Sequence, residues 1–370
     1  MKTGLTLGKF APLHKGHQLL IERAISQTDH LIVIVYDAPE TTKVPLPVRS
    51  DWIRKLYPSV EVIEAWDGPT VVGDTPDIMK MQEDFLLRLL AGRRITHFFS
   101  SEFYGDHISK ALAAEDCRVD DERAIVPISA TVIRDNPYVT RHFLAPEVYS
   151  DFVIKVVLLG APSTGKTSLA EALAREFDTD WMPEYGRDYW EANQKDRRLT
   201  LEQLVEIAEG HIHREDAKTL DSNRFLFVDT DATTTFLFSL YYHGAAHPRL
   251  AQLAENTRHR YDLFFLCGDE IPYDDTWDRS GYANRSIFQK QTRADLLHRR
   301  IPFIDLKGPL GVRIKTVKDV LEGFDKFDSV ANSLKNKKSE QTDAPNSHAF
   351  GTFVTDPADA GSAPKASGSR

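Results

Sequence analysis

Short apolar runs alternate with amphipathic stretches along the first half of the chain. The strand-like runs are Thr3–Leu7, Leu31–Tyr36, Val60–Ala65 and His97–Ser101. Between them, apolar residues recur at helical spacing over His17–Thr28, Val48–Tyr57 and Ile78–Ala91. Strands separated by helices are joined by crossover connections, which pair them in parallel. The pattern therefore predicts an α/β fold with a parallel sheet, whose ligands bind at the carboxyl ends of the strands.

The same alternation restarts in the second half. Val153–Leu159 is a nearly continuous apolar run, as expected of a strand that is buried on both faces. Further strand-like runs are Phe225–Val228, Leu263–Leu266 and Pro302–Leu306. We therefore expect two α/β domains, residues 1–147 and 151–328. From residue 329 to 370 the chain is rich in Ser, Ala, Pro, Gly and charged residues, and this composition predicts disorder.

Composition narrows the class of protein. The 370 residues include 46 Lys and Arg against 55 Asp and Glu, which gives a formal net charge of −9 and argues against nucleic acid as a partner. The two cysteines, Cys117 and Cys267, cannot build a disulfide framework. Neither a signal peptide nor an apolar run of membrane-spanning length is evident. We expect a cytoplasmic enzyme that is not embedded in a membrane.

The first chemical motif follows the first predicted strand. The sequence GKFAPLHKGH fits G-x-F-x-P-x-H-x-G-H, with Gly8, Phe10, His14, Gly16 and His17 as candidate ligand-binding residues. Glycines let a backbone approach phosphates, and the amino end of a helix supplies N–H groups. The two histidines are three residues apart and project to one side of a helix, so both could hold one triphosphate. The alternative is a turn with two surface histidines.

A second element at the end of this half reads ISATVIR. Ser129 and Thr131 can donate hydrogen bonds to phosphate oxygens, and Arg134 can add a charge-assisted contact. By itself the same sequence also fits a capped helix with a solvated arginine.

The second half opens with GAPSTGKT, which fits the P-loop pattern G-x-x-x-x-G-K-[ST] between a strand and a helix. Its candidate nucleotide-binding residues are Gly160, Ser163, Gly165, Lys166, Thr167 and Ser168. Lys166 is expected to reach the β- and γ-phosphates of ATP, and Thr167 to bind Mg²⁺. Asp229, at the end of the apolar run FLFVD, is the expected carboxylate on the metal side, with Asp231 as the alternative.

Two polar segments are candidates for the rest of this second site. In PEYGRDY, Glu184 could orient or deprotonate an acceptor hydroxyl, and Arg187 could hold a phosphate; the alternative is a solvated loop. In YDDTWDRSGYANRS, Arg279 and Arg285 could close onto the γ-phosphate as parts of a lid. The alternative for that segment is a surface loop.

The first two motifs together resemble the HxGH nucleotidyltransferases. In that family an acceptor phosphate attacks the α-phosphorus of ATP and pyrophosphate leaves. The resemblance implies that His17 contacts the α-phosphate and that His14 holds the triphosphate. It also implies that Ser129, Thr131 and Arg134 bind the β- and γ-groups.

The order of all the motifs resembles the NadR-type bifunctional enzymes, over about residues 1–327. The resemblance implies a Rossmann-like nicotinamide mononucleotide adenylyltransferase followed by a P-loop ribosylnicotinamide kinase. Its substrates would be nicotinamide riboside, nicotinamide mononucleotide and ATP, with NAD as product or feedback ligand. A homo-oligomer is compatible with such an enzyme. Such an enzyme would also bring a nicotinamide-stacking aromatic residue, for which Trp52 and Trp66 are candidates.

Other interpretations stay open. The same folds could act on another nucleoside or on phosphopantetheine. A protein that binds ATP or NAD as a sensor and regulates a transporter is a third possibility. Some members of the family begin with a helix-turn-helix domain, whereas the first strand here starts within a few residues of Met1. We therefore expect no DNA binding.

Overall fold

The computed structural model describes residues 1–71, 73–101, 105–195, 198–272 and 282–327. For residues 282–284 it describes the backbone alone. Arg279 and the tail from residue 329, for which disorder is expected, lie outside this range. Residues 1–327 form one compact unit that contains two parallel sheets.

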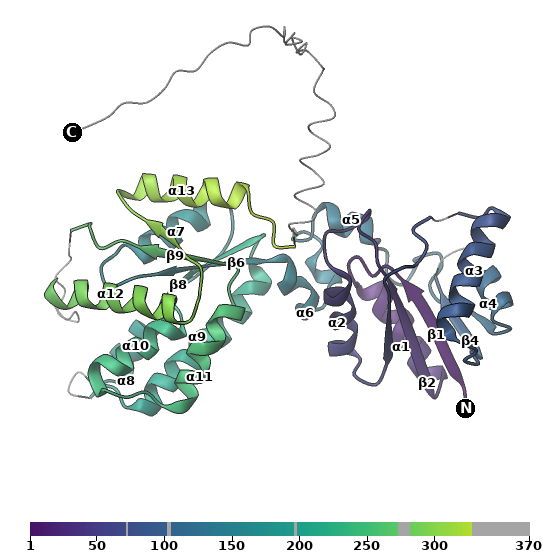
Figure 1. Ribbon diagram of the computed structural model, residues 1–370, viewed down its shortest axis with the longest axis horizontal. Coiled ribbons are helices and arrows are strands. Elements are labelled where there is room, and N and C mark those ends of the chain that lie inside the picture. Colours follow the sequence, from purple (N-terminus) through teal and green to yellow (C-terminus); the bar gives the residue numbers. More distant parts are fainter. Residues whose placement is uncertain (72, 102–104, 196–197, 273–281, 328–370) are drawn as a thin grey trace, which may run out of the picture. The chain divides into compact units, whose positions relative to one another are not determined.

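The first sheet has five parallel strands in the order β3-β2-β1-β4-β5, of which β2, β1 and β4 are labelled in Figure 1. Its strands are β1 (Thr3–Gly8), β2 (His30–Tyr36), β3 (Glu61–Ala65), β4 (His97–Ser100) and β5 (Glu115–Arg118). The helices between them are α1 (Lys15–Gln27), α2 (Leu46–Leu56), α3 (Pro76–Leu90) and α4 (Gly105–Ala111). The strand order changes direction at β1, so the loop that follows β1 lies where α/β sheets bind ligands.

Both faces of this sheet are covered because the central strand β2 is apolar at consecutive positions. Val33 and Val35 pack in one cluster with apolar residues of α1 and α2, whereas Ile32 and Ile34 pack in another with residues of α3 and α4. Successive side chains of a strand point to opposite faces. The run HLIVIVY therefore needs helices on both sides, and the crossovers supply them.

The second sheet is also parallel, in the order β10-β9-β6-β8-β7. Its strands are β6 (Ile154–Leu159), β7 (Trp181–Met182), β8 (Phe225–Asp229), β9 (Leu263–Cys267) and β10 (Ile304–Leu306). Its helices are α7 (Lys166–Glu176), α8 (Tyr185–Asn193), α9 (Leu201–Asp221), α10 (Ala232–His243), α11 (Pro248–Asn256), α12 (Tyr282–His298) and α13 (Leu310–Glu322). The central strand β6 leads directly into the GAPSTGKT turn, with α7 behind it.

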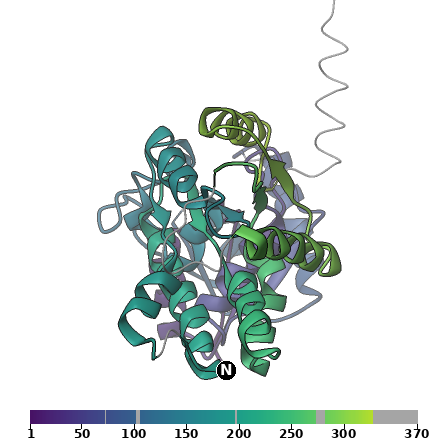
Figure 2. The same ribbon diagram turned by 90° about the vertical axis from the view of Figure 1, so that its left-hand side faces the viewer.

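Helices α7 and α13 lie together on one face of this sheet, and α9 and α12 lie on the other (Figures 1 and 2). Leu169 and Leu173 of α7 and Val317 of α13 pack against β6 through Val156 and Leu158. Both faces of β6 are thereby buried.

A short connection joins the two sheets. It contains α5 (Ala130–Asp135), η1 (Arg141–Phe143), α6 (Pro146–Tyr149) and η2 (Ser150–Phe152). The Tyr149 hydroxyl donates to the Ser222 carbonyl at 2.6 Å, and the Trp52 Nε1 donates to the Asp151 carboxylate at 2.7 Å. The connection therefore makes contacts with both halves, and the division into domains at 147 and 151 stays a prediction.

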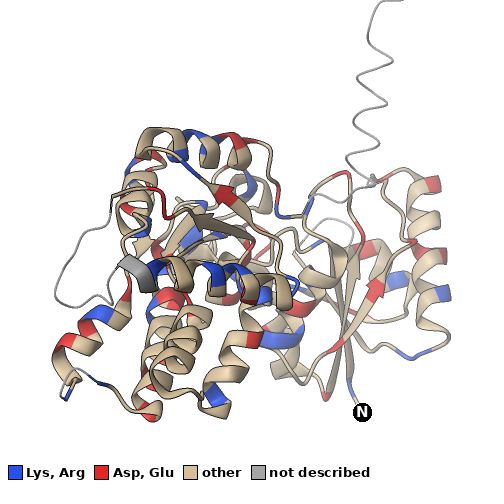
Figure 3. Ribbon diagram, turned by 60° about the vertical axis from the view of Figure 1, so that its left-hand side comes forward, with Lys and Arg blue, Asp and Glu red and all other residues tan. Residues whose placement is uncertain are grey.

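The predicted fold class is confirmed, and the strand-like runs of the sequence all form strands of the two sheets. The edge strand β5 was missed because its sequence EDCR is polar and largely exposed. None of the described helices is long and apolar enough to cross a membrane. Basic and acidic positions are interspersed along the helices (Figure 3).

Candidate active sites

The loop after β1 is shaped by its motif residues. Gly8 ends the strand, and Phe10 follows with a φ of 45° and a side chain that is 1% exposed. The Phe10 ring meets the His17 ring edge-on, with 4.9 Å between centroids. A Cβ atom on Gly16 would lie 3.0 Å from the His14 ring, which is tighter than ordinary contact. Phe10 and Gly16 therefore set the place of the two histidines.

His14 and His17 close the amino end of α1 by capping each other. The His14 Nδ1 accepts a hydrogen bond from the Gly16 N–H at 3.1 Å, and the His17 Nδ1 accepts one from the His14 N–H at 3.4 Å. The two rings are stacked, with centroids 3.8 Å apart. Because each Nδ1 is an acceptor, a neutral ring carries its proton on Nε2, which can then donate to a phosphate oxygen.

Both rings are held neutral. Burial, followed by the charge of Arg123, lowers the pKa of His14 to about 4. Burial and the neighbouring His14 lower the pKa of His17 well below its usual value. Two protonated imidazoles could not lie in this stack without strong repulsion. The pair is thus neutral rather than doubly charged.

The ISATVIR segment reaches this loop through its arginine. The Arg134 guanidinium donates to the Ala11 carbonyl at 2.6 Å and to the Thr131 hydroxyl at 3.1 Å. Ser129 caps α5, where its hydroxyl accepts from the Val132 N–H at 3.4 Å. The structure thus brings the two predicted segments together. The direct phosphate contacts expected of Ser129, Thr131 and Arg134 stay predictions.

A buried arginine that the sequence analysis missed supports the same loop. Arg49 of α2 is fully buried and donates to the backbone carbonyls of Lys9, Tyr36 and Val44. It joins the ends of β1 and β2, because Lys9 follows β1 and Tyr36 ends β2. A single arginine within an amphipathic helix gives no sequence signal that separates it from a solvated one.

The second site is built on the P-loop between β6 and α7. Gly160 has a φ of 141° and Gly165 a φ of 78°, which are conformations that favour glycine. A Cβ atom on Gly160 would lie only 2.7 Å from the Cys267 carbonyl oxygen. Ser163 also adopts a positive φ, of 60°. These residues shape the turn that the motif predicts.

Lys166 and Thr167 begin α7 beside the end of β8. The Lys166 Nζ donates to the carbonyls of Gly160 and Ala161, each at 3.1 Å. The Thr167 hydroxyl donates to the Asp229 Oδ2 at 2.5 Å. Burial raises the pKa of Asp229 to about 6, although Lys166 opposes this shift. The predicted lysine, hydroxyl and carboxylate are therefore brought together.

The donors present fit a magnesium ion. The Asp229 Oδ1 is buried and has no hydrogen-bond partner among the described residues. One carboxylate and one hydroxyl suit Mg²⁺, which takes its remaining ligands from water and nucleotide phosphates. The alternative carboxylate, Asp231, instead caps α10 by accepting from the Thr233 and Thr234 N–H groups.

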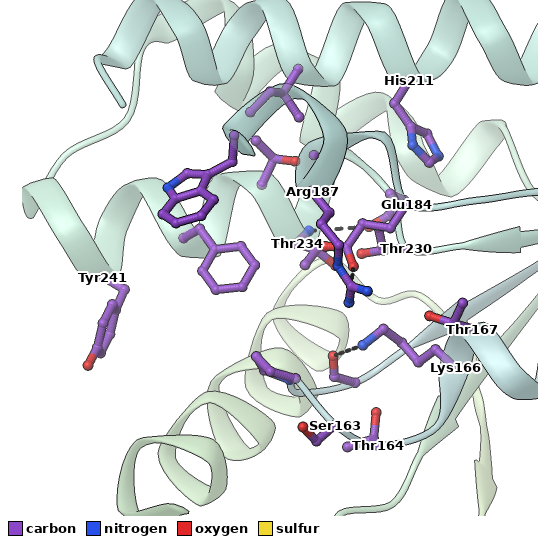
Figure 4. Close-up of a pocket in the computed structure, with 18 of the residues that line it drawn as sticks. Ser163, Thr164, Lys166, Thr167, Glu184, Arg187, His211, Thr230, Thr234 and Tyr241 are labelled. Atoms are coloured by element: carbon purple, nitrogen blue, oxygen red, sulfur yellow. Dashed lines mark hydrogen bonds and ion pairs between the residues drawn. The ribbon is translucent and has the colours of Figure 1, made fainter. Parts of the chain in front are cut away.

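A cavity of about 880 Å³ opens beside the P-loop (Figure 4). The lining includes Gly160, Ser163, Gly165, Lys166, Thr167 and Ser168, together with the predicted acceptor residues Glu184 and Arg187. The Arg187 guanidinium lies 3.9 Å from the Glu184 carboxylate, and both residues are partly exposed to the cavity. PEYGRDY therefore contributes to the site rather than forming a remote solvated loop.

Three buried side chains from α12 and α13 hold the P-loop backbone. Arg285 donates to the Ser163 carbonyl at 2.9 Å, and Arg313 donates to the Thr164 carbonyl at 2.6 Å. Gln289 accepts from the Ala161 N–H at 2.8 Å. Arg285 is 2% exposed, so its position differs from the predicted lid over the γ-phosphate. Arg279, the other predicted lid arginine, lies outside the described residues.

The two tryptophans proposed for ring stacking have contrasting positions. Trp52 is fully buried and its Nε1 is bound to Asp151, so the expected stacking role is wrong for it. Trp66 is 59% exposed, and its role stays a prediction.

Two family models match separate parts of the chain. The cytidylyltransferase-like model matches residues 5–136, and the AAA domain model matches residues 155–313. The first range contains the histidine loop and α5, and the second contains the P-loop and its supporting arginines. The match agrees with an amino-terminal nucleotidyltransferase fold and a carboxyl-terminal P-loop fold.

Similar proteins cover most of the chain. The trifunctional NAD biosynthesis/regulator protein NadR of Salmonella typhimurium is 30% identical over 82% of this chain and 78% of its own length. Two crystal structures of NadR protein share the fold. The structure in complex with NAD and AMP-PNP has a TM-score of 0.53, and the one in complex with NR has 0.52. Each is 23% identical and covers 88% of this chain and 97% of its own. The chain belongs to the NadR family of NAD biosynthesis proteins.

Proposed function

We propose that this chain makes NAD in two successive ATP-dependent steps. The carboxyl-terminal half phosphorylates nicotinamide riboside to nicotinamide mononucleotide. The amino-terminal half then transfers an adenylyl group from a second ATP to the mononucleotide, which yields NAD and pyrophosphate. The observation that carries this proposal is the presence of two different phosphate-binding loops, each at the carboxyl end of the central strand of its own parallel sheet.

In adenylyl transfer, a phosphate oxygen of the mononucleotide attacks the α-phosphorus of ATP, and the bond to the bridging oxygen of pyrophosphate breaks. Negative charge builds up on the α-phosphate and on the leaving group. We expect the Nε2–H groups of His14 and His17 to donate to these oxygens, and backbone N–H groups hold both rings. Arg134, anchored on Ala11, adds positive charge.

In the kinase step, the 5′-hydroxyl of the riboside attacks the γ-phosphorus of a second ATP, and ADP leaves. Lys166 exchanges its loop carbonyls for phosphate oxygens, and Glu184 accepts the hydroxyl proton. Thr167 and Asp229 would hold Mg²⁺, which neutralises charge on the β- and γ-phosphates when bound. The aromatic side chains of Trp190, Phe238 and Tyr241 line the cavity and can contact a pyridine ring.

Two single substitutions test whether the sites act separately. Lys166→Ala should lower riboside phosphorylation by on the order of 100-fold or more, because a charge that stabilises the transition state is lost. The same variant should keep its adenylyl transfer to supplied mononucleotide. His17→Ala should have the opposite pattern. Each activity is measured by separate assays for ADP and pyrophosphate.

Loss of both activities from either variant, in a protein with unchanged thermal unfolding, would refute two separate sites. A panel of acceptors with ATP separates the proposal from the alternatives. Phosphopantetheine or another nucleoside as the preferred acceptor would change the substrate, and no turnover at all would favour a sensor.

Several further expectations belong to this proposal. They are the use of Mg²⁺, the binding of NAD as product or feedback ligand, an assembly of identical copies, the lack of nucleic-acid binding, and a cytoplasmic location. The domain limits 1–147 and 151–328 are tested by expressing the two ranges as separate proteins, each of which should fold and keep its own activity if the limits are correct.

A further inference from the structure

A histidine outside every motif lies in the wall of the kinase cavity. His211 of α9 is 4% exposed and lines the cavity beside the P-loop. Its Nε2 atom is buried and finds no hydrogen-bond partner in the part of the chain that the structure describes. A buried polar atom without a partner costs about 1–3 kcal/mol, so a ligand that supplies one binds favourably there.

Thr230, at the end of β8, also has a buried polar atom without a hydrogen-bond partner among the described residues. The residue follows Asp229, is 6% exposed and lines the same cavity. Its hydroxyl is buried and, within the described ranges, makes no hydrogen bond. Its φ of 69° is rare for a β-branched residue, and such strained backbone is concentrated at functional sites.

The chemistry of these two side chains narrows the ligand group. Burial lowers the pKa of His211, although Glu215 and Glu184 oppose this shift, so the ring is neutral near pH 7. A neutral imidazole has one donor and one acceptor, and a threonine hydroxyl can also do both. A phosphate offers acceptors only, whereas an alcohol both donates and accepts. Either side chain can therefore pair with a hydroxyl group, as donor or as acceptor.

We expect the sugar at this wall of the cavity. His211, Glu184 and Thr230 lie on the same side of the view as Thr167 and Lys166, and Tyr241 lies on the opposite side (Figure 4). The 5′-hydroxyl must reach the γ-phosphate at the P-loop. The remaining sugar hydroxyls are then within one furanose ring of that point, and the base extends toward the aromatic side.

We propose that His211 and Thr230 bind the vicinal hydroxyls of the acceptor's ribose and make the kinase half selective for ribosides over deoxyribosides. This inference rests on the proposed kinase function. A site that hydrogen-bonds a substrate hydroxyl rejects the analogue that lacks it, because its own buried groups are then left unpaired.

Wild-type enzyme with nicotinamide riboside and its 2′-deoxy and 3′-deoxy analogues provides the test. We expect kcat/KM to be on the order of 100-fold lower for at least one analogue. His211→Leu, a change to an apolar side chain, should lower kcat/KM for the riboside by about 10- to 100-fold and change that of the rejected analogue by less than about threefold. His211→Gln should restore part of the selectivity.

His213→Leu is the matched control, because His213 is exposed on the same helix. It should leave both kcat/KM values unchanged. If His211→Leu does not fold, as judged by thermal unfolding and by adenylyl transfer in the same chain, Thr230→Val makes the same test at the second residue.

Equal kcat/KM for the riboside and both analogues in the wild type would overturn the inference. An equal loss on all three substrates in the variants would overturn it as well, since it would indicate a merely structural role. Failure of the wild type to phosphorylate any riboside would instead refute the proposed kinase function.

Discussion

At the scale of single residues, burial lowers the pKa of a base in one site and raises the pKa of an acid in the other. His14 is a buried base whose pKa is lowered to about 4, and Asp229 is a buried acid whose pKa is raised to about 6. In both cases burial disfavours the charged form. Neutral imidazoles can donate hydrogen bonds to ATP without bringing two adjacent charges together. Burial disfavours the ionised form of the Asp229 carboxyl group, and a bound cation would stabilise that form.

The lowered pKa of His14 predicts how stability depends on pH. The unfolded chain takes up the His14 proton near pH 6.5, whereas the folded chain resists protonation until about pH 4. The contribution of neutral His14 to stability is therefore complete above pH 6.5 and is lost as the pH falls toward 4. Integrated over this window it amounts to about 3 kcal/mol.

His14→Gln should therefore make the free energy of unfolding less dependent on pH. The raised pKa of Asp229 changes the free energy of unfolding in the opposite direction over the same pH range. Because Asp229 is present in both proteins, its contribution cancels from the difference between them. Urea unfolding of both proteins between pH 7 and pH 4 measures the change. Parallel stability profiles would contradict the shifted pKa.

At the scale of elements, the P-loop depends on helices that come late in the chain. Arg313 of α13 is 2% exposed and donates to the carbonyls of Thr164, Gly268 and Gly308. Arg285 and Gln289 of α12 hold two further backbone groups of the loop. The motif therefore supplies the residues that we expect to bind the phosphates, and α12 and α13 keep their backbone in place.

Arg313→Met should destabilise the protein by about 3 kcal/mol or more, because several buried carbonyls lose their donor. It should also raise the KM for ATP in riboside phosphorylation and leave that of adenylyl transfer unchanged. Thermal unfolding and the two assays measure these effects.

Arg293→Met in α12 is the control for this change. Arg293 pairs with Asp305 at the surface, where both side chains are about 40% exposed. Surface ion pairs contribute about 0–1 kcal/mol, so this variant should be nearly as stable as the wild type. Equal destabilisation by the two changes would show that Arg313 has no special role.

At the scale of the whole molecule, each half has its own sheet and its own loop that we expect to bind phosphates. Mononucleotide made in one half must therefore reach a different site before adenylyl transfer. We expect it to do so through solution. The consequence is that two chains, each with one inactive site, can complete the pathway together.

A mixture of the His17→Ala and Lys166→Ala proteins should convert riboside to NAD after a lag in which mononucleotide accumulates. Neither protein alone should do so. Excess unlabelled mononucleotide should dilute the label that passes from riboside into NAD. Absence of NAD from the mixture, while each protein keeps its remaining activity, would indicate that the intermediate does not exchange between chains.

The sequence by itself predicted most strands of both sheets, three helices of the first half and the two motifs. Runs such as HLIVIVY and VIKVVLL are typical of strands buried on both faces, and GKFAPLHKGH and GAPSTGKT carry their chemistry within a few consecutive residues. The polar edge strand β5 escaped because it lacks an apolar pattern. The spacing of residues along the chain is sufficient to predict a strand or a motif when the interactions that define it involve residues close together in the sequence.

Only the tertiary structure decided which distant residues support or complete the sites. Arg49, Arg313 and His211 lie in ordinary helices, and nothing in their neighbours along the chain separates a buried polar side chain from a solvated one. Arg285 was expected on a lid and instead holds the P-loop from within the fold. Burial and hydrogen bonding across the fold depend on which helix covers which loop, and that is settled by packing rather than by sequence spacing.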